Sequence, residues 1–207
     1  MLHYLKNYTP SPQPTRRSFL KMSAGAVGGL VIGMSLPRSV MAQDAASNDT
    51  LVTPFVHITP DNRVIVLSKH LDKGQGAATG LATLVAEELD AATDQVEVTF
   101  APSNPELYKN LLFGVQGTGG STAMANSFDQ YRQAGAAARA MLINAAAAEW
   151  SMDASNISVS NGMVTGGQNS APFGDLAAKA AILDVPAEVM LKSPDQWVYI
   201  GKSFPRV

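Results

Sequence analysis

Two glycine-rich segments are the parts of this sequence whose residue types and spacing could do chemistry. The first covers residues 73–80 (Lys-Gly-Gln-Gly-Ala-Ala-Thr-Gly), and the second covers residues 116–123 (Gln-Gly-Thr-Gly-Gly-Ser-Thr-Ala). Each precedes a stretch with helical periodicity, so its backbone N–H groups would lie at a helix N-terminus, where unpaired donors and the helix dipole favour an anion. Glycine lets the backbone approach a ligand closely, and Gln75, Ser121 and Thr122 add side-chain donors. The two segments are therefore candidates for binding an anionic ligand.

Neither segment contains a complete nucleotide-binding motif. Neither segment contains Gly-Lys-Ser/Thr, and neither is a Gly-x-Gly-x-x-Gly fingerprint leading straight from a strand. The alternative interpretation is that both are flexible turns that cap helices, with Ser121 or Thr122 as an N-cap worth about 1 kcal/mol. The residues alone leave both interpretations open.

The other polar residues do not complete a catalytic or metal site. His57 alternates with apolar residues and is expected on a strand surface, while His70 either lines a site or makes a structural hydrogen bond. The acidic residues 87, 88 and 90 come at the end of a predicted helix, where we expect them to be solvated, with ion pairing or an interface as the alternative. Because the chain has no cysteine, thiol nucleophiles, cysteine-ligated zinc and an iron–sulfur cluster on this chain are excluded. We assign no catalytic and no metal-ligating residue.

Composition and charge narrow the class of protein. The chain has 207 residues with 15% charged side chains and a formal net charge of −2. All acidic residues follow residue 42, and residues 43–207 contain 10 basic and 17 acidic side chains. This charge argues against nucleic acid as a partner, and the length is sufficient to bury a core.

The first 42 residues resemble an export signal. Residues 15–21 (Thr-Arg-Arg-Ser-Phe-Leu-Lys) precede a moderately apolar run over 22–36, and Val-Met-Ala at residues 40–42 is a plausible cleavage site. The alternative, a transmembrane anchor, is disfavoured because the run is shorter than the roughly 20 residues needed and contains four glycines. We expect a twin-arginine signal over 1–42, which directs the protein to the periplasm, and a linker over 43–54.

Hydrophobic periodicity predicts an α+β fold with helices packed on a mixed or antiparallel sheet. A hairpin is predicted over 55–68, a helix over about 78–90, a strand over 96–100, a long helix from 124 to 145, a second hairpin around the Asn-Gly pair at 161–162, and a short helix over 170–181 capped by Ser170. Residues 55–190 form the predicted domain. The tail over 191–207 contains Trp197, Tyr199 and Phe204, and it either covers a core edge or begins a linker.

Four stretches of the sequence carry a resemblance to a known family. They are residues 69–81 (Lys-His-Leu-Asp-Lys-Gly-Gln-Gly-Ala-Ala-Thr-Gly-Leu), 84–89, 116–127 and 135–142. Over these residues the chain is similar to the molybdopterin-binding large subunit of the xanthine dehydrogenase/aldehyde oxidase family, and most similar to the isoquinoline 1-oxidoreductase type, whose large subunit carries a twin-arginine signal. The resemblance covers essentially all of the chain after the predicted signal.

The resemblance implies a cofactor, a reaction and partners. The cofactor would be molybdopterin, often as the cytosine dinucleotide form. Gly74, Gln75 and Gly76 would contact its pterin and dithiolene region, and phosphate or pterin oxygens would be held by four further residues, Gly119, Gly120, Ser121 and Thr122. The family hydroxylates aldehydes or aromatic nitrogen heterocycles with a water-derived oxygen, and a partner small subunit with [2Fe–2S] clusters removes the electrons.

The sequence also departs from the family pattern. Large subunits of the family are several times longer, and their second glycine-rich cofactor segment and C-terminal catalytic glutamate have no counterpart here. Lys73 stands where many relatives have methionine, and residues 200–207 resemble the junction to a further domain. We expect the N-terminal part of an exported molybdenum hydroxylase large subunit, truncated or split from its remainder and inactive alone. The alternatives are a non-enzymatic pterin- or nucleotide-binding module and an inactive remnant.

Overall fold

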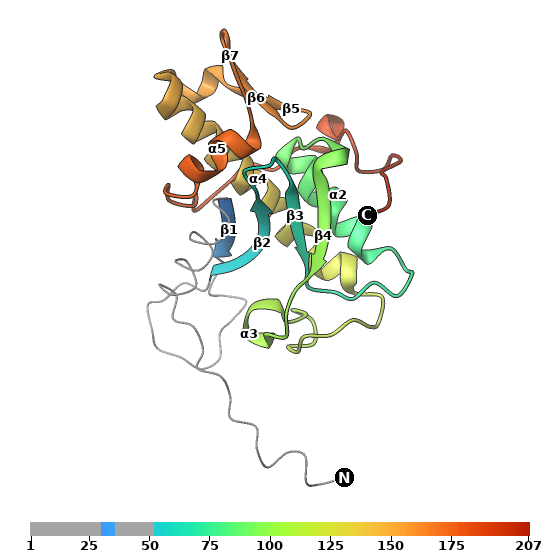
Figure 1. Cartoon of the computed structure of the whole chain (residues 1–207). Coiled ribbons are helices and arrows are strands. Elements are labelled where there is room, and N and C mark those ends of the chain that lie inside the picture. The colour runs from blue at the N-terminus through green and yellow to red at the C-terminus, as the bar shows by residue number, and fades with distance from the viewer. Residues whose placement is uncertain (1–29, 36–51) are drawn as a thin grey trace, which may run out of the picture.

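A four-stranded mixed sheet lies at the centre of the computed structural model, which describes residues 30–35 and 52–207 (Figure 1). Its strands are β1 (Leu30–Ser35), β2 (Val52–Ile58), β3 (Val64–Ser68) and β4 (Val96–Phe100), in that spatial order. The first two pairs are antiparallel, and β3 pairs with β4 in parallel. The predicted α+β fold with a mixed sheet is confirmed.

The hairpin of β2 and β3 follows from its turn residues. The Thr59 amide donates to the Arg63 carbonyl, and the Arg63 amide donates to Oγ1 of Thr59. Asn62 has the left-handed conformation (φ 65°) that asparagine tolerates well. In β3, Val64 and Val66 are buried and alternate with half-buried residues, as a strand covered mainly on one face requires. The hairpin predicted over 55–68 is confirmed, with β2 beginning at Val52 in the expected linker.

Helix α2 (Ala77–Leu89) connects the parallel strands β3 and β4, because parallel neighbours require a crossover. The segments that follow β3 and β4 therefore leave the sheet at the same edge. One of these segments contains the first glycine-rich stretch, and the other contains the short helix α3 (Pro105–Tyr108) and the second glycine-rich stretch. The topology itself brings the two candidate segments to one end of the sheet.

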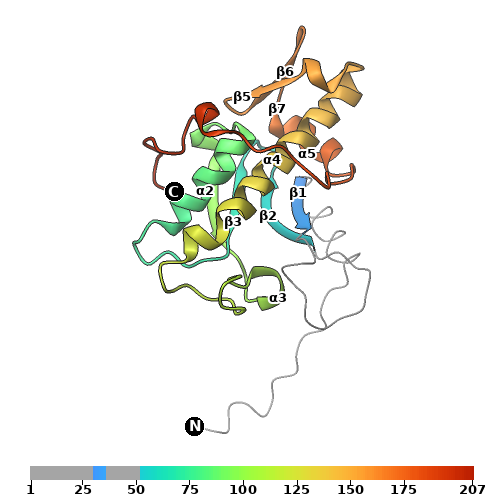
Figure 2. The ribbon, with the colours of Figure 1, turned by 180° about the vertical axis from the view of Figure 1, so that it is seen from behind.

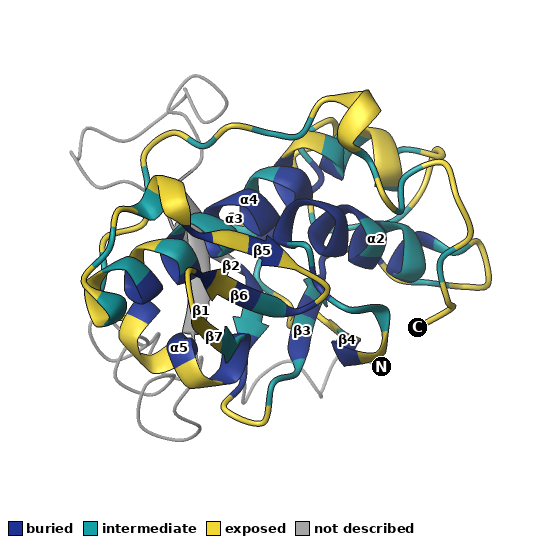
Figure 3. Cartoon of the chain, turned by 90° about the horizontal axis from the view of Figure 1, so that it is seen from above, coloured by how far each residue is buried: buried dark blue, intermediate teal, exposed yellow. Residues whose placement is uncertain are grey.

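The long helix α4 (Ala123–Trp150) packs beside α2 on one face of the sheet (Figure 2). The close approach depends on small residues, since a Cβ at Gly135 would lie only 2.7 Å from the backbone oxygen of Val85. Residues along the contact between the two helices are buried (Figure 3). The buried Tyr131 also ties α4 to the end of β3, donating to the Leu67 carbonyl (2.6 Å) and accepting from the Lys69 amide (2.9 Å).

A second, three-stranded sheet follows α4. It contains β5 (Ser158–Ser160), β6 (Met163–Gly166) and β7 (Asn169–Pro172), and α5 (Phe173–Ala180) comes after it. The predicted Asn161-Gly162 hairpin is confirmed, and both residues have positive φ (47° and 76°). The predicted start of the last helix is wrong, because Ser170 pairs in β7 and Pro172 is the N-cap. Short 3₁₀ turns occupy Thr93–Gln95, Ala154–Asn156 and Pro194–Gln196.

Most of the predicted signal lies outside the described residues. Only Leu30–Ser35 of it is described, as strand β1 at the edge of the sheet. Cleavage after Ala42 would remove this strand and leave β2 as the edge, so the export prediction has a direct structural consequence. No helix in the described part of the chain is both long and apolar enough to cross a bilayer.

Candidate functional site

The two glycine-rich segments lie next to each other. The Leu71 amide donates to Oγ1 of Thr118 at 2.8 Å. The buried His70 ring is also in contact with the second segment, with Nδ1 at 3.2 Å from the Gly117 carbonyl and Nε2 at 3.4 Å from Oδ1 of Asn126. Burial and the nearby Lys69 charge lower the pKa of His70, which favours the neutral imidazole. Of the two roles expected for His70, the geometry shows the structural one. The His70 ring joins the two segments by its hydrogen bonds.

The second segment presents a run of unused backbone donors. Among the described residues, no acceptor pairs with the amides of residues 117–121. A Cβ at Gly117 or Gly119 would meet no atom within 4 Å, so the backbone is open to close approach. Gly120 and Ser121 both have positive φ (59° and 55°). Such a run of amides is the arrangement that binds anions in proteins.

Neighbouring polar side chains fix the shape of the second segment. The buried Asn110 donates from Nδ2 to Oγ1 of Thr122 (2.7 Å), and this hydroxyl donates to the Gly119 carbonyl (2.9 Å). Thr122 occupies the N-cap position of α4, but its side chain makes no capping hydrogen bond to the helix. The simple capping interpretation of Ser121 and Thr122 is therefore wrong. The free donors are left for another group.

The first segment is different, because a carboxylate already occupies the start of α2. Oδ1 of Asp72 accepts from the amides of Gly74 (2.8 Å) and Gly76 (3.2 Å), and Oδ2 accepts from the amide of Ala78 (2.9 Å). These hydrogen bonds, that of Ala78 first, lower the pKa of Asp72 and keep it charged. The expectation that the glycine amides of this segment are free for an anion is wrong. The sequence itself could have indicated this cap, because an aspartate a few residues before a predicted helix is a common capping signal.

The side chain of Gln75 is likewise used within its own segment. Its Nε2 donates to the Leu71 carbonyl (2.7 Å), and its Oε1 accepts from the Lys73 amide (2.6 Å). Gln75 is exposed, so both hydrogen bonds compete with water. A ligand that uses this side chain would have to displace one of them.

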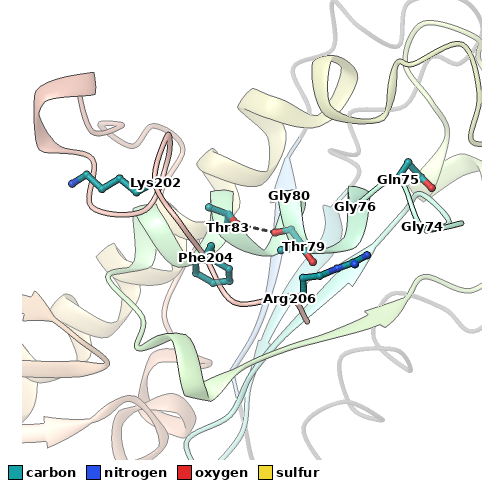
Figure 4. A pocket seen from close by; sticks show the side chains of 9 residues that line it. All are labelled: Gly74, Gln75, Gly76, Thr79, Gly80, Thr83, Lys202, Phe204 and Arg206. Carbon is teal, nitrogen blue, oxygen red and sulfur yellow. Dashed lines mark hydrogen bonds between the residues drawn. The ribbon is translucent and has the colours of Figure 1, made fainter.

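A pocket of about 440 Å³ lies between the first turns of α2 and the C-terminal tail (Figure 4). Its inner side is formed by the residues of the first segment and α2: Gly74, Gln75, Gly76, Thr79, Gly80 and Thr83. Its outer side is formed by Lys202, Phe204 and Arg206 of the tail. Arg206 points toward the glycine-rich segment, whereas Nζ of Lys202 donates to the Trp197 carbonyl (3.1 Å). Sequence reasoning missed these tail residues because they are more than 100 positions away in the chain.

Glu87 and Glu88 at the end of α2 are buried and Asp90 is paired with cations, so the expectation that these residues are solvated is wrong. Glu87 and Glu88 are 0% and 1% exposed. Nη2 of Arg132 lies 2.6 Å from Oε1 of Glu88, and Nζ of Lys192 lies 2.6 Å from Oδ1 of Asp90. The ion-pairing alternative is the correct one, because the tail and α4 cover this end of the helix. In the described part of the chain, no group of histidine and acidic side chains is arranged to hold a metal ion.

Lys69 provides a test of the electrostatics beside His70. It is only 4% exposed, its Nζ donates to Oε1 of Gln130 (2.7 Å), and burial lowers its pKa to about 8. The unfolded chain therefore binds more protons than the folded chain above about pH 8, and stability should rise with pH. Above about pH 10 the rise should end, because burial raises the pKa of Tyr108 to about 12 and also raises that of Tyr131.

We expect the free energy of unfolding to increase by up to ~2 kcal/mol between pH 8 and 10 through Lys69. Urea denaturation at several pH values measures this increase. The Lys69→Met variant should lack it, while all other titrating groups stay the same. Equal pH slopes for the two proteins would show that Lys69 is not the source.

Comparisons with known proteins identify the family. A family model described as "Molybdopterin cofactor-binding domain" matches residues 23–203. The chain is 35% identical over 190 residues to the beta subunit of isoquinoline 1-oxidoreductase from Brevundimonas diminuta, covering 86% of this chain and 24% of that protein. It is 31% identical over 155 residues to a nicotinate dehydrogenase subunit from Pseudomonas putida, covering 74% and 13%. It is 29% identical over 174 residues to a membrane-bound aldehyde dehydrogenase [pyrroloquinoline-quinone] of Gluconacetobacter polyoxogenes, covering 80% and 21%.

These relatives are subunits or enzymes of oxidoreductase type, and the chain spans about a quarter of their length or less. The matched range contains both glycine-rich segments, α2 and α4. The resemblance that the sequence suggested is therefore confirmed. The chain belongs to the family of molybdopterin cofactor-binding domains found in molybdenum-dependent oxidoreductases.

Proposed function

We propose that this chain forms one wall of the molybdopterin site in a molybdenum hydroxylase large subunit. The observation that supports it is the run of amides over residues 117–121, which have no acceptor among the described residues and lie beside open space. Bound molybdopterin carries two or more negative charges and many hydrogen-bonding atoms, which suits such donors. When bound, the cofactor would provide the redox chemistry by which a substrate is hydroxylated with an oxygen atom from water.

The residues of the second segment fit this group best. Gly119, Gly120 and Ser121 offer free amides for phosphate or pterin oxygens, while Thr122 keeps the loop in shape through Asn110. Nδ2 of Asn126, one turn into α4, is buried without a partner in the described residues and adds a further donor.

The first segment has a different part in the proposal. Gly74 and Gly76 have no atom within 4 Å of a Cβ position, so they permit close approach although Asp72 uses their amides. Gln75 is exposed and can exchange its hydrogen bonds within the loop for bonds to a ligand. Thus Gly74, Gln75 and Gly76 would shape the pterin side of the site rather than neutralise its charge.

Further parts of the proposal rest on the sequence and on the named relatives. The twin-arginine motif supports export to the periplasm. Two of the relatives are named as subunits, which supports a partner chain that we propose carries [2Fe–2S] clusters, and the relatives' names suggest an aldehyde or a nitrogen heterocycle as substrate. The cytosine dinucleotide is the proposed form of the cofactor. Because the chain spans a quarter of the length of its relatives, catalysis is proposed to require additional polypeptide.

A glycine substitution separates cofactor binding from folding. The chain, purified from a host that makes molybdenum cofactor, should retain molybdopterin, measured as fluorescent oxidised pterin per chain. Gly119→Ala should lower this retention about tenfold, because the added methyl group blocks close approach. Thermal unfolding should not change, since the Cβ meets no protein atom.

The exposed Gln168→Ala in the β6–β7 turn is the control and should leave retention unchanged. Parent protein without pterin, or equal pterin in parent and Gly119→Ala, would contradict the proposal. The name of one relative includes pyrroloquinoline quinone. A parallel assay of the purified chain for this quinone shows whether it is bound in place of molybdopterin. Turnover by this chain alone would contradict the proposal that catalysis requires additional polypeptide.

A further inference from the structure

A buried carboxylate in the last turn of α2 holds three consecutive amides of the C-terminal tail. Glu87 in α2 is fully buried. Its oxygens accept from the backbone N–H groups of Val198 (2.9 Å), Tyr199 (2.6 Å) and Ile200 (2.9 Å). Although burial alone would raise the pKa of Glu87, these donors and the Lys192 ammonium outweigh it and lower the pKa. A charged carboxylate therefore fixes the path of the tail.

Neighbouring contacts fix the same part of the tail. The Lys192 amide donates to Oε2 of Glu88 (3.0 Å), and Nζ of Lys192 donates to the Glu87 carbonyl (2.6 Å). The Tyr199 hydroxyl donates to the Ala91 carbonyl (2.8 Å). The anchored stretch thus extends from Lys192 to Ile200.

Beyond this anchor the tail returns along α2 to its first turn. The rings of Tyr199 and Phe204 are in edge-to-face contact, with centroids 5.4 Å apart. The Val207 amide lies 3.4 Å from Oγ1 of Thr79. Phe204 and Arg206 consequently form the outer side of the pocket whose inner side is the first glycine-rich segment (Figure 4).

Arg206 has an electrostatic role at this pocket. Its side chain points toward the first glycine-rich segment (Figure 4), and its positive charge makes a small contribution to lowering the pKa of Asp72. The charge of Asp72 opposes an incoming anion at the start of α2, and Arg206 offsets this charge. The position of Arg206 therefore adds a positive charge on the outer side of the pocket.

We propose that Glu87 is a positioning residue for this pocket: it holds the tail so that Phe204 and Arg206 form its outer side. That this pocket receives part of an anionic cofactor rests on the proposed function. The positioning itself does not, because it concerns only this chain's own residues and can be measured without any cofactor.

The absence of cysteine makes a direct test possible, because an introduced pair is the only pair of thiols. Thr83→Cys and Lys202→Cys place one thiol on each side of the pocket and keep Phe204 and Arg206. With Glu87 intact, a short bifunctional maleimide should join them rapidly. With Glu87→Gln added, cross-linking should slow by at least about tenfold, because the charge-assisted hydrogen bonds of the anchor are weakened.

A matched control separates positioning from general loss of stability. Leu176→Ala in α5 removes a fully buried side chain that belongs neither to the anchor nor to the pocket, and it should leave the cross-linking rate unchanged. A second variant, Val198→Pro, deletes one amide donor to Glu87 without altering the carboxylate and should slow cross-linking as Glu87→Gln does. Unchanged rates in Glu87→Gln and Val198→Pro, or an equal decrease in Leu176→Ala, would overturn the proposal.

Discussion

Replacing Arg132 with methionine should lower the free energy of unfolding by about 3–5 kcal/mol, because the variant leaves a buried carboxylate without its cation. Arg132 is 8% exposed, and its Nε donates to Oε1 of Glu88 at 2.7 Å. It also donates to the Lys192 carbonyl and lies 5.4 Å from the centroids of the Phe128 and Trp197 rings. Urea denaturation followed by circular dichroism measures the loss.

The double variant Arg132→Met, Glu88→Gln is the control for this prediction. It removes the orphaned charge as well as the cation, so it should recover part of the stability that Arg132→Met loses. Arg63→Met removes ion pairs to Asp61 and Glu97 that lie at the surface, and it should cost no more than about 1 kcal/mol. An Arg132→Met variant as stable as Arg63→Met would show that the buried pair contributes little.

Gly135→Val should destabilise the fold by about 3 kcal/mol or more, the second large effect that we expect. A Cβ at this position lies 2.7 Å from the Val85 carbonyl oxygen and 3.0 Å from Cβ of Glu88. Both are parts of α2, so the two helices would have to separate. Glycine is the poorer helix former, and the clash must therefore outweigh a gain in helix propensity of several tenths of a kcal/mol.

Asn144→Val tests the same side chain at an exposed position of α4. It should change the free energy of unfolding by less than about 1 kcal/mol. If Gly135→Val and Asn144→Val unfold at the same urea concentration, close packing of α2 against α4 does not require glycine at 135.

Local sequence signals predicted the elements well, because each depends on nearby residues. The Asn161-Gly162 turn, the β2–β3 hairpin and the periodicity of α4 were all found where expected. The start of α5 was not found where expected. Residues 169–172 form a strand because they pair with β6, and this pairing is not visible in the local sequence. The parallel pairing of β3 with β4 likewise depends on the whole sheet.

The candidate site was predictable only in part. Glycine composition indicated both segments, and the fold brings them together through His70 and Thr118. The burial of Glu87 could not be predicted from α2 alone, since its partners lie more than 100 residues later in the tail. Arg206 is likewise more than 100 residues from the first segment, so the sequence did not indicate that it lines the same pocket.

The return of the tail along α2 has a practical consequence for biochemistry with this protein. The Val207 amide lies 3.4 Å from the Thr79 hydroxyl, so any affinity tag fused after it would start against the opening turn of the helix. Such a fusion would crowd the rim where Arg206 lies and distort ligand titrations. A tag inserted at the exposed Gln168, in the turn between β6 and β7, would leave that rim untouched.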